Sequence, residues 1–204
     1  MRENYSIEQL KKVANDMRID IIEETHSAKS GHPGGSLSST DILAVLYFHE
    51  MNVDPKNPTW EDRDRLALSK GHAAPALYAA LAERGFFDKA ELKQLRKVGS
   101  FLQGHPDRKH TPGVDISTGS LGQGISQAVG VALFGKKMNK DYRTYAILGD
   151  GEMQEGEVWE ALMSAAHYDL TNFTVILDSN RLQIDGNVKD VMSIYPVKEK
   201  LEAF

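Results

Sequence analysis

A chain of 204 residues that is 41% hydrophobic and 26% charged can form one domain with a substantial core. Its formal net charge of −5 gives no reason to expect a nucleic-acid or acidic-membrane partner, because both favour basic patches. The sequence contains no cysteine, which excludes disulfides and thiolate metal sites and suits a reducing cytoplasm.

Targeting signals are not recognisable in the sequence. Residues 1–12 are charged and lack the apolar centre of a signal peptide. No apolar stretch approaches the roughly 20 residues that are needed to cross a bilayer. We therefore expect a cytoplasmic protein with no membrane partner.

The first half of the chain predicts helices joined by loops. Ser6 and Gln9 have the spacing of a capping box, and the apolar residues that follow recur at helical intervals. The stretch SAKSGHPGGSLSST is rich in Gly and Ser and is therefore expected to be irregular, with Ser39 or Thr40 capping the next helix. The expected elements are a helix at 7–25, a loop at 27–40, a helix at 41–50, a surface connection at 51–64, a strand at 65–69, a turn and helix at 70–85, and a helix at 89–98.

The second half predicts an alternation of strands and helices. A long irregular stretch at 101–124 is the kind of segment that is usually functional or disordered. The later elements are expected to be a helix at 125–138, a strand at 144–150, a helix at 157–168 and a strand at 173–180. Both strands are nearly continuous apolar runs, which is typical of parallel strands covered on both faces. The fold class is therefore α/β, with an open, mostly parallel sheet and helices on both faces.

Polar groups follow two of the predicted strands. Gly149-Asp150-Gly151 ends one, and Asp178-Ser179-Asn180 ends the other. In open α/β sheets ligands bind beyond the carboxyl ends of the strands, so Asp150 and Asn180 converge if these strands are neighbours. A carboxylate and an amide oxygen suit Mg²⁺ or Ca²⁺, and Mg²⁺ bound by so few protein groups usually also binds phosphate oxygens. Gly151 would let a phosphate approach the backbone, and the following helix offers its N-terminal N–H groups.

At this spacing the sequence resembles a known family. The pair GDG and Asn180 is similar to the thiamine diphosphate motif, and the surrounding residues resemble transketolase. The matching stretches occur in the family's order and cover nearly the whole chain: SGHPGG (30–35), SKGHAAPALYA (69–79), QGHPD (103–107), STGSLGQGIS (117–126), LGDGEMQEGEVWEA (148–161) and LDSNRLQIDG (177–186).

The resemblance implies a cofactor site for thiamine diphosphate and a divalent ion. It implies that Asp150, Asn180 and the backbone carbonyl of Leu182 bind the metal, and that Gly151 donates its N–H to the diphosphate. His72 would lie beside the cofactor. Three loop residues would line the cofactor: Gly119, Ser120 and Leu121. The family more often has proline at the position of Ser120.

The resemblance also implies a substrate channel lined by His32 and His105. Together with His72 they form the expected catalytic set, because ketol transfer moves protons near neutral pH, where imidazole titrates. The other histidines are expected to be solvated or to cap helices: His26, His49, His110 and His167.

Four glutamates follow the GDG motif. The resemblance implies that Glu155 and Glu160 lie at a dimer interface, near the partner's site. Glu152 and Glu157 are instead expected to act through their charge at the start of the helix, where carboxylates are favoured by the helix dipole.

The chain is short for a complete transketolase. The resemblance implies that residues 1–204 form the diphosphate-binding domain, shortened at its C-terminus, and that the pyrimidine-binding and C-terminal domains are absent. We therefore expect the N-terminal subunit, or a fragment, of a transketolase made of two polypeptides. The complementary pyrimidine-domain subunit would carry the glutamate that activates the cofactor.

The expected activity is transfer of a two-carbon ketol unit between sugar phosphates. The GDG and Asn180 pair is also found in other thiamine diphosphate enzymes, so a deoxyxylulose-phosphate synthase or a 2-oxoacid dehydrogenase subunit remains an alternative. A third interpretation is a module without activity of its own, which only binds metal and diphosphate or forms a homodimer through the helix at 124–138.

Overall fold

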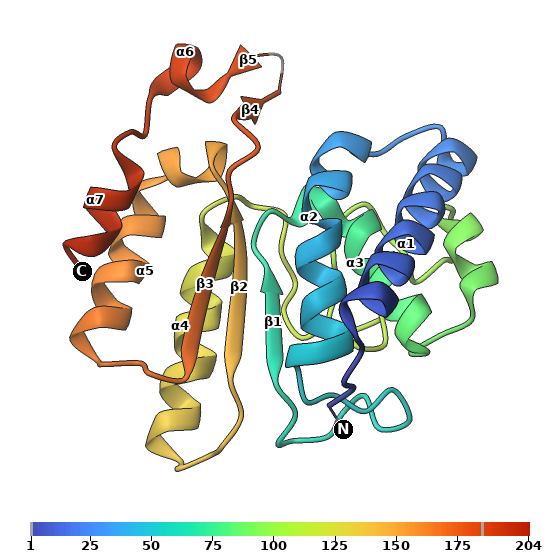
Figure 1. Ribbon diagram of the computed structural model, residues 1–204, viewed down its shortest axis with the longest axis horizontal. Coiled ribbons are helices and arrows are strands. Elements are labelled where there is room, and N and C mark those ends of the chain that lie inside the picture. The colour runs from blue at the N-terminus through green and yellow to red at the C-terminus, as the bar shows by residue number, and fades with distance from the viewer. Residues whose placement is uncertain (1, 185) are drawn as a thin grey trace.

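The computed structural model describes residues 2–184 and 186–204, and its centre is a parallel sheet with strand order β1-β2-β3 (Figure 1). The strands of this sheet are β1 (Arg65–Leu68), β2 (Thr144–Gly149) and β3 (Phe173–Asp178). A small antiparallel pair follows β3 and consists of β4 (Leu182–Gln183) and β5 (Gly186–Asn187).

Helices cover both faces of the sheet. One layer contains α1 (Ile7–Ala28), α2 (Pro33–Val45) and α3 (Ala74–Arg84), and the other contains α4 (Gln123–Lys137) and α5 (Gly156–His167) (Figure 1). Shorter helical pieces are η1 (Leu46–Glu50), η2 (Gly71–Ala73), η3 (Lys89–Gln94), η4 (Gly151–Gln154), α6 (Val188–Met192) and α7 (Val197–Glu202). The expected open α/β sheet with helices on both faces is confirmed.

The strands divide their side chains between two cores, as the period of a strand requires. Leu66 and Leu68 of β1 pack into the cluster formed with α1, α2 and α3. Ala67, Ala146 and Leu148 of β1 and β2 point the other way, into the cluster formed with α4 and α5. The alanines leave room for α4 to approach the sheet closely.

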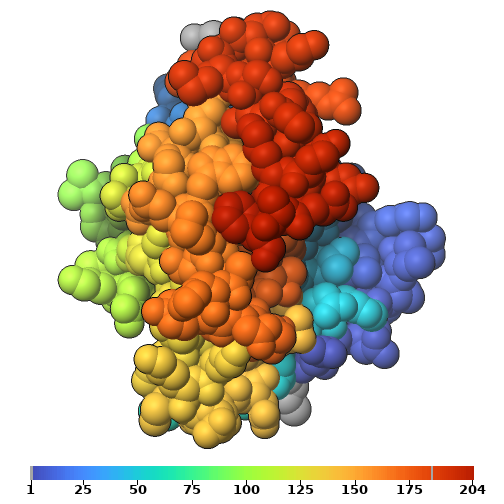
Figure 2. All heavy atoms as spheres, turned by 90° about the vertical axis from the view of Figure 1, so that its left-hand side faces the viewer, coloured from blue at the N-terminus to red at the C-terminus, as the bar shows by residue number. Residues whose placement is uncertain are grey.

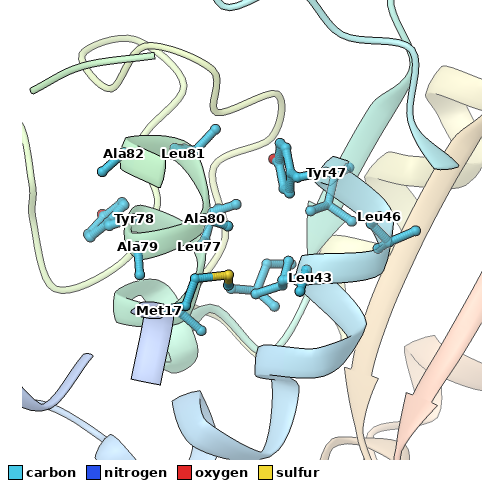
Figure 3. Packing of buried hydrophobic residues seen from close by; sticks show 14 of the residues in the cluster. Met17, Leu43, Leu46, Tyr47, Leu77, Tyr78, Ala79, Ala80, Leu81 and Ala82 are labelled. Carbon is cyan, nitrogen blue, oxygen red and sulfur yellow. The ribbon is translucent and has the colours of Figure 1, made fainter. Parts of the chain in front are cut away.

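The larger core lies between the first three helices and the sheet (Figure 3). Met17 of α1, Leu43 of α2 and Leu81 of α3 are fully buried there. Burial of each such side chain contributes about 1.5–3 kcal/mol relative to leaving it exposed. This packing fixes the positions of the loops that follow β1 and precede α2.

The expected loop at 27–40 is wrong over most of its length, because α2 begins at Pro33. Proline suits the first turn of a helix, where its missing N–H has no partner to lose. The hydroxyls of Ser36, Ser39 and Thr40 donate to carbonyls four residues earlier, so these residues lie within the helix and neither of the expected caps forms. Tertiary packing of this buried face overrides the low helix propensity of Gly and Ser.

Other boundaries differ less from the expected ones. The capping box of Ser6 and Gln9 is present, and α1 continues to Ala28. Helical structure after α2 continues to Glu50 through the π-turn η1. The helix expected at 89–98 is instead the 3₁₀ segment η3, which ends at Gln94. The irregular segment after residue 101 is confirmed and extends to Gly122, which caps α4.

The C-terminal residues pack over α5, as the red spheres of Figure 2 show. The rings of Trp159 and Phe204 stack with centroids 6.4 Å apart, and Lys200 lies 5.7 Å from the Trp159 ring. Among the described residues, no helix combines the length and apolar character that a membrane span needs.

Candidate cofactor-binding site

The carboxyl ends of β2 and β3 lie side by side, as the sequence predicted. Gly149 pairs with Asp178 in the parallel ladder, and the N–H of Asp150 donates to the carbonyl of Asp178 at 3.3 Å. After Asn180 the chain turns back, so the N–H of Arg181 donates to Oδ2 of Asp150 at 2.7 Å. Asp150 is 1% exposed, and the residue whose N–H it accepts from, Arg181, directly follows Asn180 in the chain.

Two of the expected metal ligands, Asn180 and Leu182, belong to one tight turn after β3, and this turn packs against the third, Asp150, at the end of β2. Arg181 adopts a φ of +66°, which brings the chain back towards Asp150, and Oδ1 of Asn180 accepts from the N–H of Leu182 at 2.9 Å. The other oxygen of Asp150 accepts from the N–H of Gly151 at 3.0 Å. Both side chains therefore have local hydrogen bonds that hold their oxygens at this end of the sheet.

This donor set fits a metal that is shared with phosphate. Across residues 2–184 and 186–204, no group of three His, Cys, Asp or Glu side chains is placed to hold a metal ion. One carboxylate, one amide and one backbone carbonyl are instead the partial set that Mg²⁺ uses when phosphates and waters complete its octahedron. The residues suit a metal–diphosphate ligand and do not suit a metal site made of protein groups alone.

Three loops converge on this end of the sheet, and glycines allow their close approach. A methyl group at Gly71 would lie 2.6 Å from the backbone nitrogen of Gly119. A methyl group at Gly119, where φ is +142°, would lie 2.8 Å from Cγ of His105. The turn after β1, the loop before α4 and the QGHPD loop therefore meet at contacts that any side chain would disrupt.

The three histidines expected in the site lie close together: His72 and His105 are on two of these loops, and His32 is the N-cap residue of α2. The rings of His32 and His72 contact edge to face with centroids 5.3 Å apart, and His105 packs against Gly119. Burial, followed by the positive charge of Lys70 and the two other imidazoles, lowers the pKa of His72 to about 4. Burial and the charge of Arg96 also lower the pKa of His105. Both rings are therefore neutral at pH 7.

A buried ion pair that the sequence reasoning missed lies near His72, and its two charges act on that ring. Nζ of Lys70 lies 2.6 Å from Oδ2 of Asp178 and also donates to the carbonyl of Gly35 at 2.9 Å. The hydroxyls of Ser38 and Ser39 donate to the same carboxylate oxygen at 2.6 and 3.0 Å. Burial opposes ionisation of Asp178, but the bonds from Lys70 and the serines outweigh it, so the pKa of this carboxyl is lowered.

The pair joins the ends of β1 and β3 to the first turns of α2. A signal for it was present in the sequence, because Lys70 lies two positions after the apolar run of β1 and Asp178 ends the apolar run of β3. Reading that signal required the knowledge that both strands flank β2, which only the order of the sheet provides.

Glu152 has a different role from the one expected. It lies in η4, before α5 begins, and is only 2% exposed. Its Oε1 accepts from the hydroxyl of Ser69 at 2.5 Å and from the N–H of Gly122 at 2.9 Å, and its Oε2 accepts from the N–H of Gly149 at 3.1 Å. One carboxylate thus joins three segments around the site, so the expected interaction with the helix dipole is not its main role.

The remaining predicted residues lie near the surface. Ser120 and Leu121 are exposed in the turn before α4, beside Gly119. Glu155 is the N-cap residue of α5 without a side-chain cap bond, and Glu160 is exposed one turn later. Glu157 lies in the first turn of α5, which agrees with the expected interaction with the helix dipole.

The four other histidines lie outside this cluster. His26 and His167 occupy the last turns of α1 and α5. Nδ1 of His49 lies 3.3 Å from the carbonyl of Tyr5, and Nδ1 of His110 lies 2.6 Å from a carboxylate oxygen of Asp107. These positions agree with capping or local hydrogen bonding.

Fold and site together are typical of α/β proteins that bind a phosphate-bearing ligand beyond the carboxyl ends of parallel strands. A sequence profile of the family described as "Transketolase, thiamine diphosphate binding domain" matches residues 9–204. The chain therefore belongs to the transketolase family and corresponds to its thiamine diphosphate-binding domain.

Two similar proteins are themselves components of divided transketolases. The 6-deoxy-6-sulfo-D-fructose transketolase subunit of Clostridium sp. (strain MSTE9) is 46% identical over 195 residues, which are 96% of this chain and 71% of that protein. One subunit of the apulose-4-phosphate transketolase of Phocaeicola vulgatus is 41% identical over 198 residues, which are 97% of this chain and 70% of that protein.

Full-length transketolases are similar over a smaller share of their length. Human transketolase is 47% identical over 99% of this chain, which spans 32% of that protein. The crystal structure of the transketolase of Campylobacter jejuni superposes with a TM-score of 0.91 at 40% identity and covers 98% of this chain and 32% of that one. The chain thus spans about a third of these longer relatives.

Proposed function

We propose that the chain is the diphosphate-binding subunit of a transketolase, which transfers a two-carbon ketol unit from a ketose phosphate to an aldose phosphate. The observation that carries the proposal is the similarity to two transketolase subunits, of which this chain spans 71% and 70%. In this proposal residues 1–204 form the diphosphate-binding domain, and the pyrimidine-binding domain comes from a complementary subunit.

The carboxyl end of the sheet would hold the cofactor. Asp150, Asn180 and the carbonyl of Leu182 would bind Mg²⁺, or Ca²⁺ in its place. The N–H of Gly151, which donates to Oδ1 of Asp150 here, would exchange this bond for one to the diphosphate. Support comes from the tight turn that places Asp150 against the backbone of Arg181. His72 would line the cofactor with three loop residues: Gly119, Ser120 and Leu121. When bound, thiamine diphosphate supplies the carbon that carries the ketol unit.

The histidines would handle protons on the sugar substrates. Because His72 and His105 are neutral at pH 7, each ring offers one N–H donor and one acceptor nitrogen to a hydroxyl or carbonyl group. His32 contacts the His72 ring and would extend the same surface towards the substrate. The lowered pKa makes His72 a weak proton acceptor, so hydrogen bonding to the substrate is a better-supported role for it than the expected proton transfer.

Association is expected at two surfaces. Glu155 and Glu160 are exposed next to the site and would lie at a dimer interface. Phe134 of α4 and its C-cap residue Met138 are 57% and 56% exposed, which supports the expectation that this helix also contacts a second copy. We further expect the enzyme to act in the cytoplasm on sugar phosphates of the kind that the pentose phosphate pathway interconverts.

The alternatives are less favoured. The similar proteins described above are transketolases, which argues against a deoxyxylulose-phosphate synthase or a 2-oxoacid dehydrogenase subunit. A module without activity of its own would bind cofactor or dimerise, and it would gain no ketol transfer when mixed with a pyrimidine-domain subunit.

The test is reconstitution. The chain is mixed with a transketolase subunit that carries a pyrimidine-binding domain, and ketol transfer from a ketose phosphate is assayed with thiamine diphosphate and Mg²⁺. We expect transfer only from the mixture. The variant Asp150→Asn should abolish transfer and metal-dependent cofactor binding, whereas Asp169→Asn, at an aspartate whose side chain is 81% exposed, should change neither. An inactive mixture, combined with unchanged metal-dependent binding in Asp150→Asn, would refute the proposal.

A further inference from the structure

A cavity lies beside the amino end of β1, and Asp150 is not among the residues that line it. It has a volume of 630 Å³ and is lined by residues just before and at the start of β1, by the segment 108–116, and by Gln127 and Val131 of α4. Small-molecule sites commonly have volumes of about 300–1,000 Å³. The cavity is therefore large enough for a metabolite, and it is separate from the proposed cofactor site.

The walls of this cavity are strongly basic, although the whole chain has a net charge of −5. Its lining includes four side chains that are cationic at pH 7, together with one histidine: Arg63, Arg65, Arg108, Lys109 and His110. Among the lining residues that the structure describes, Asp115 is the only acidic one. Composition does not account for this local excess of positive charge.

The single carboxylate is shared by two arginines. Oδ1 of Asp115 lies 2.7 Å from Arg63 and 3.8 Å from Arg65, and the side chains of these arginines are 16% and 15% exposed. Asp115 also accepts from the N–H of Leu66 at 2.9 Å. The charge of Asp64 also acts on Arg65, and each guanidinium group donates to a backbone carbonyl, Arg63 to Trp60 and Arg65 to Glu61. These two arginines therefore form the positively charged inner wall of the cavity.

The outer part of the cavity offers cations that are not otherwise engaged. Arg108 and Lys109 are exposed, and within the described part of the chain their side chains make no ion pair or hydrogen bond. His110 uses Nδ1 in its contact with Asp107, so Nε2 remains available. Pro112 and Ile116 supply an apolar wall beside these groups.

We propose that this cavity binds a small molecule that carries a phosphate group. Guanidinium and ammonium groups form charge-assisted hydrogen bonds with phosphate oxygens, and the planar fork of arginine matches their geometry. The volume exceeds that of inorganic phosphate, and the apolar wall suits the carbon part of a phosphate ester. The segment 108–116 lies between His105 and Gly119 in the chain, so occupancy would also order the loop that carries these two site residues.

The experiment is a titration of the isotope-labelled chain at constant ionic strength, followed through its backbone amide resonances. The probes are inorganic phosphate, ribose 5-phosphate and ribose. Both phosphates should shift the amides of residues 108–116, and ribose should not. Tighter binding of ribose 5-phosphate identifies an ester site, whereas equal binding identifies a site for free phosphate, and both results support the proposal.

Two double variants separate this site from general electrostatic attraction. Arg108→Gln with Lys109→Gln should weaken phosphate binding at least about tenfold, because it removes two charged donors. Lys11→Gln with Lys12→Gln removes the same charge from α1, on the other face of the sheet, and should leave binding unchanged. Equal weakening in both variants, or shifts confined to residues 149–151 in the wild-type chain, would overturn the proposal.

Discussion

Replacement of Glu152 by alanine should loosen three segments of the proposed cofactor site at once. The carboxylate accepts from Ser69 at the end of β1, from Gly122 before α4 and from Gly149 at the end of β2. Alanine leaves the three donors without this partner in a place where the native side chain is almost fully buried. The two backbone N–H groups cannot rotate to find new acceptors, whereas the serine hydroxyl can.

The size of the effect follows from these contacts. A hydrogen bond to a charged group contributes about 1.5–3 kcal/mol, so three such bonds set an upper limit of roughly 4.5–9 kcal/mol. Burial raises the pKa of Glu152, which shows that desolvation of the carboxylate offsets part of this gain. We therefore expect a loss of about 3–5 kcal/mol, the range found when one partner of a buried charged network is removed.

Equilibrium unfolding in urea, followed by circular dichroism, measures this loss. Glu157→Ala is the matched control, because Glu157 lies in the first turn of α5 and should contribute only about 0.3–1 kcal/mol through the helix dipole. Calorimetric titration with thiamine diphosphate and Mg²⁺ should show weaker binding for Glu152→Ala only. If Glu152→Ala loses less than about 1 kcal/mol, or no more than Glu157→Ala, the carboxylate does not hold these segments together.

Two further substitutions test the packing of the site and a buried charge. Gly119→Ala should destabilise the fold by about 1–3 kcal/mol and weaken cofactor binding, because the new methyl group meets His105 and the native φ is +142°. Thermal unfolding measures the change in stability. Gly130→Ala in α4 is the control: among the described residues none lies within 4 Å of the new methyl group, so this variant should be neutral or slightly stabilising. Equal behaviour of the two variants would contradict the close contact with His105. Burial, together with the charge of Asp20, raises the pKa of Glu24 from 4.5 to about 10, and neither carboxylate oxygen has a hydrogen-bond partner in the described structure. Because the pKa of Glu24 is higher in the folded than in the unfolded chain, the protonated carboxyl stabilises the fold below the unfolded-state pKa, and this stabilisation is lost as pH rises towards 10. Glu24→Gln, which cannot ionise, should therefore stabilise the protein by about 2–3 kcal/mol at pH 7, and the difference should vanish near pH 4. Urea unfolding at both pH values measures this, and a difference independent of pH would show that Glu24 does not titrate as described.

Much of the fold could be predicted because its signals are local. The apolar runs at β2 and β3, the capping box before α1 and the Gly-Asp-Gly turn each depend on residues close together in sequence. The parallel arrangement followed from the continuous apolar character of the strands. Convergence of Asp150 with Asn180 then followed from the rule that ligands lie beyond the carboxyl ends of such strands.

The prediction failed where distant contacts decide the local structure. Residues 33–40 are rich in Gly and Ser and indicated a loop, yet they form α2 because its buried face packs against α1 and α3. The role of Glu152 was also predicted wrongly, because its three donors come from Ser69, Gly122 and Gly149, and only the last is close to it in sequence.

The sequence by itself determined the class of this protein, since the alternation of strands and helices along the chain and the residues that follow each strand can be read from it directly. Only the tertiary structure decided which buried charges are paired. Lys70 and Asp178 are separated by more than one hundred positions, and their contact exists because both flanking strands end beside β2. Desolvation makes an unpaired buried charge unfavourable, and whether a partner is within reach depends on distances that no local pattern of residues encodes.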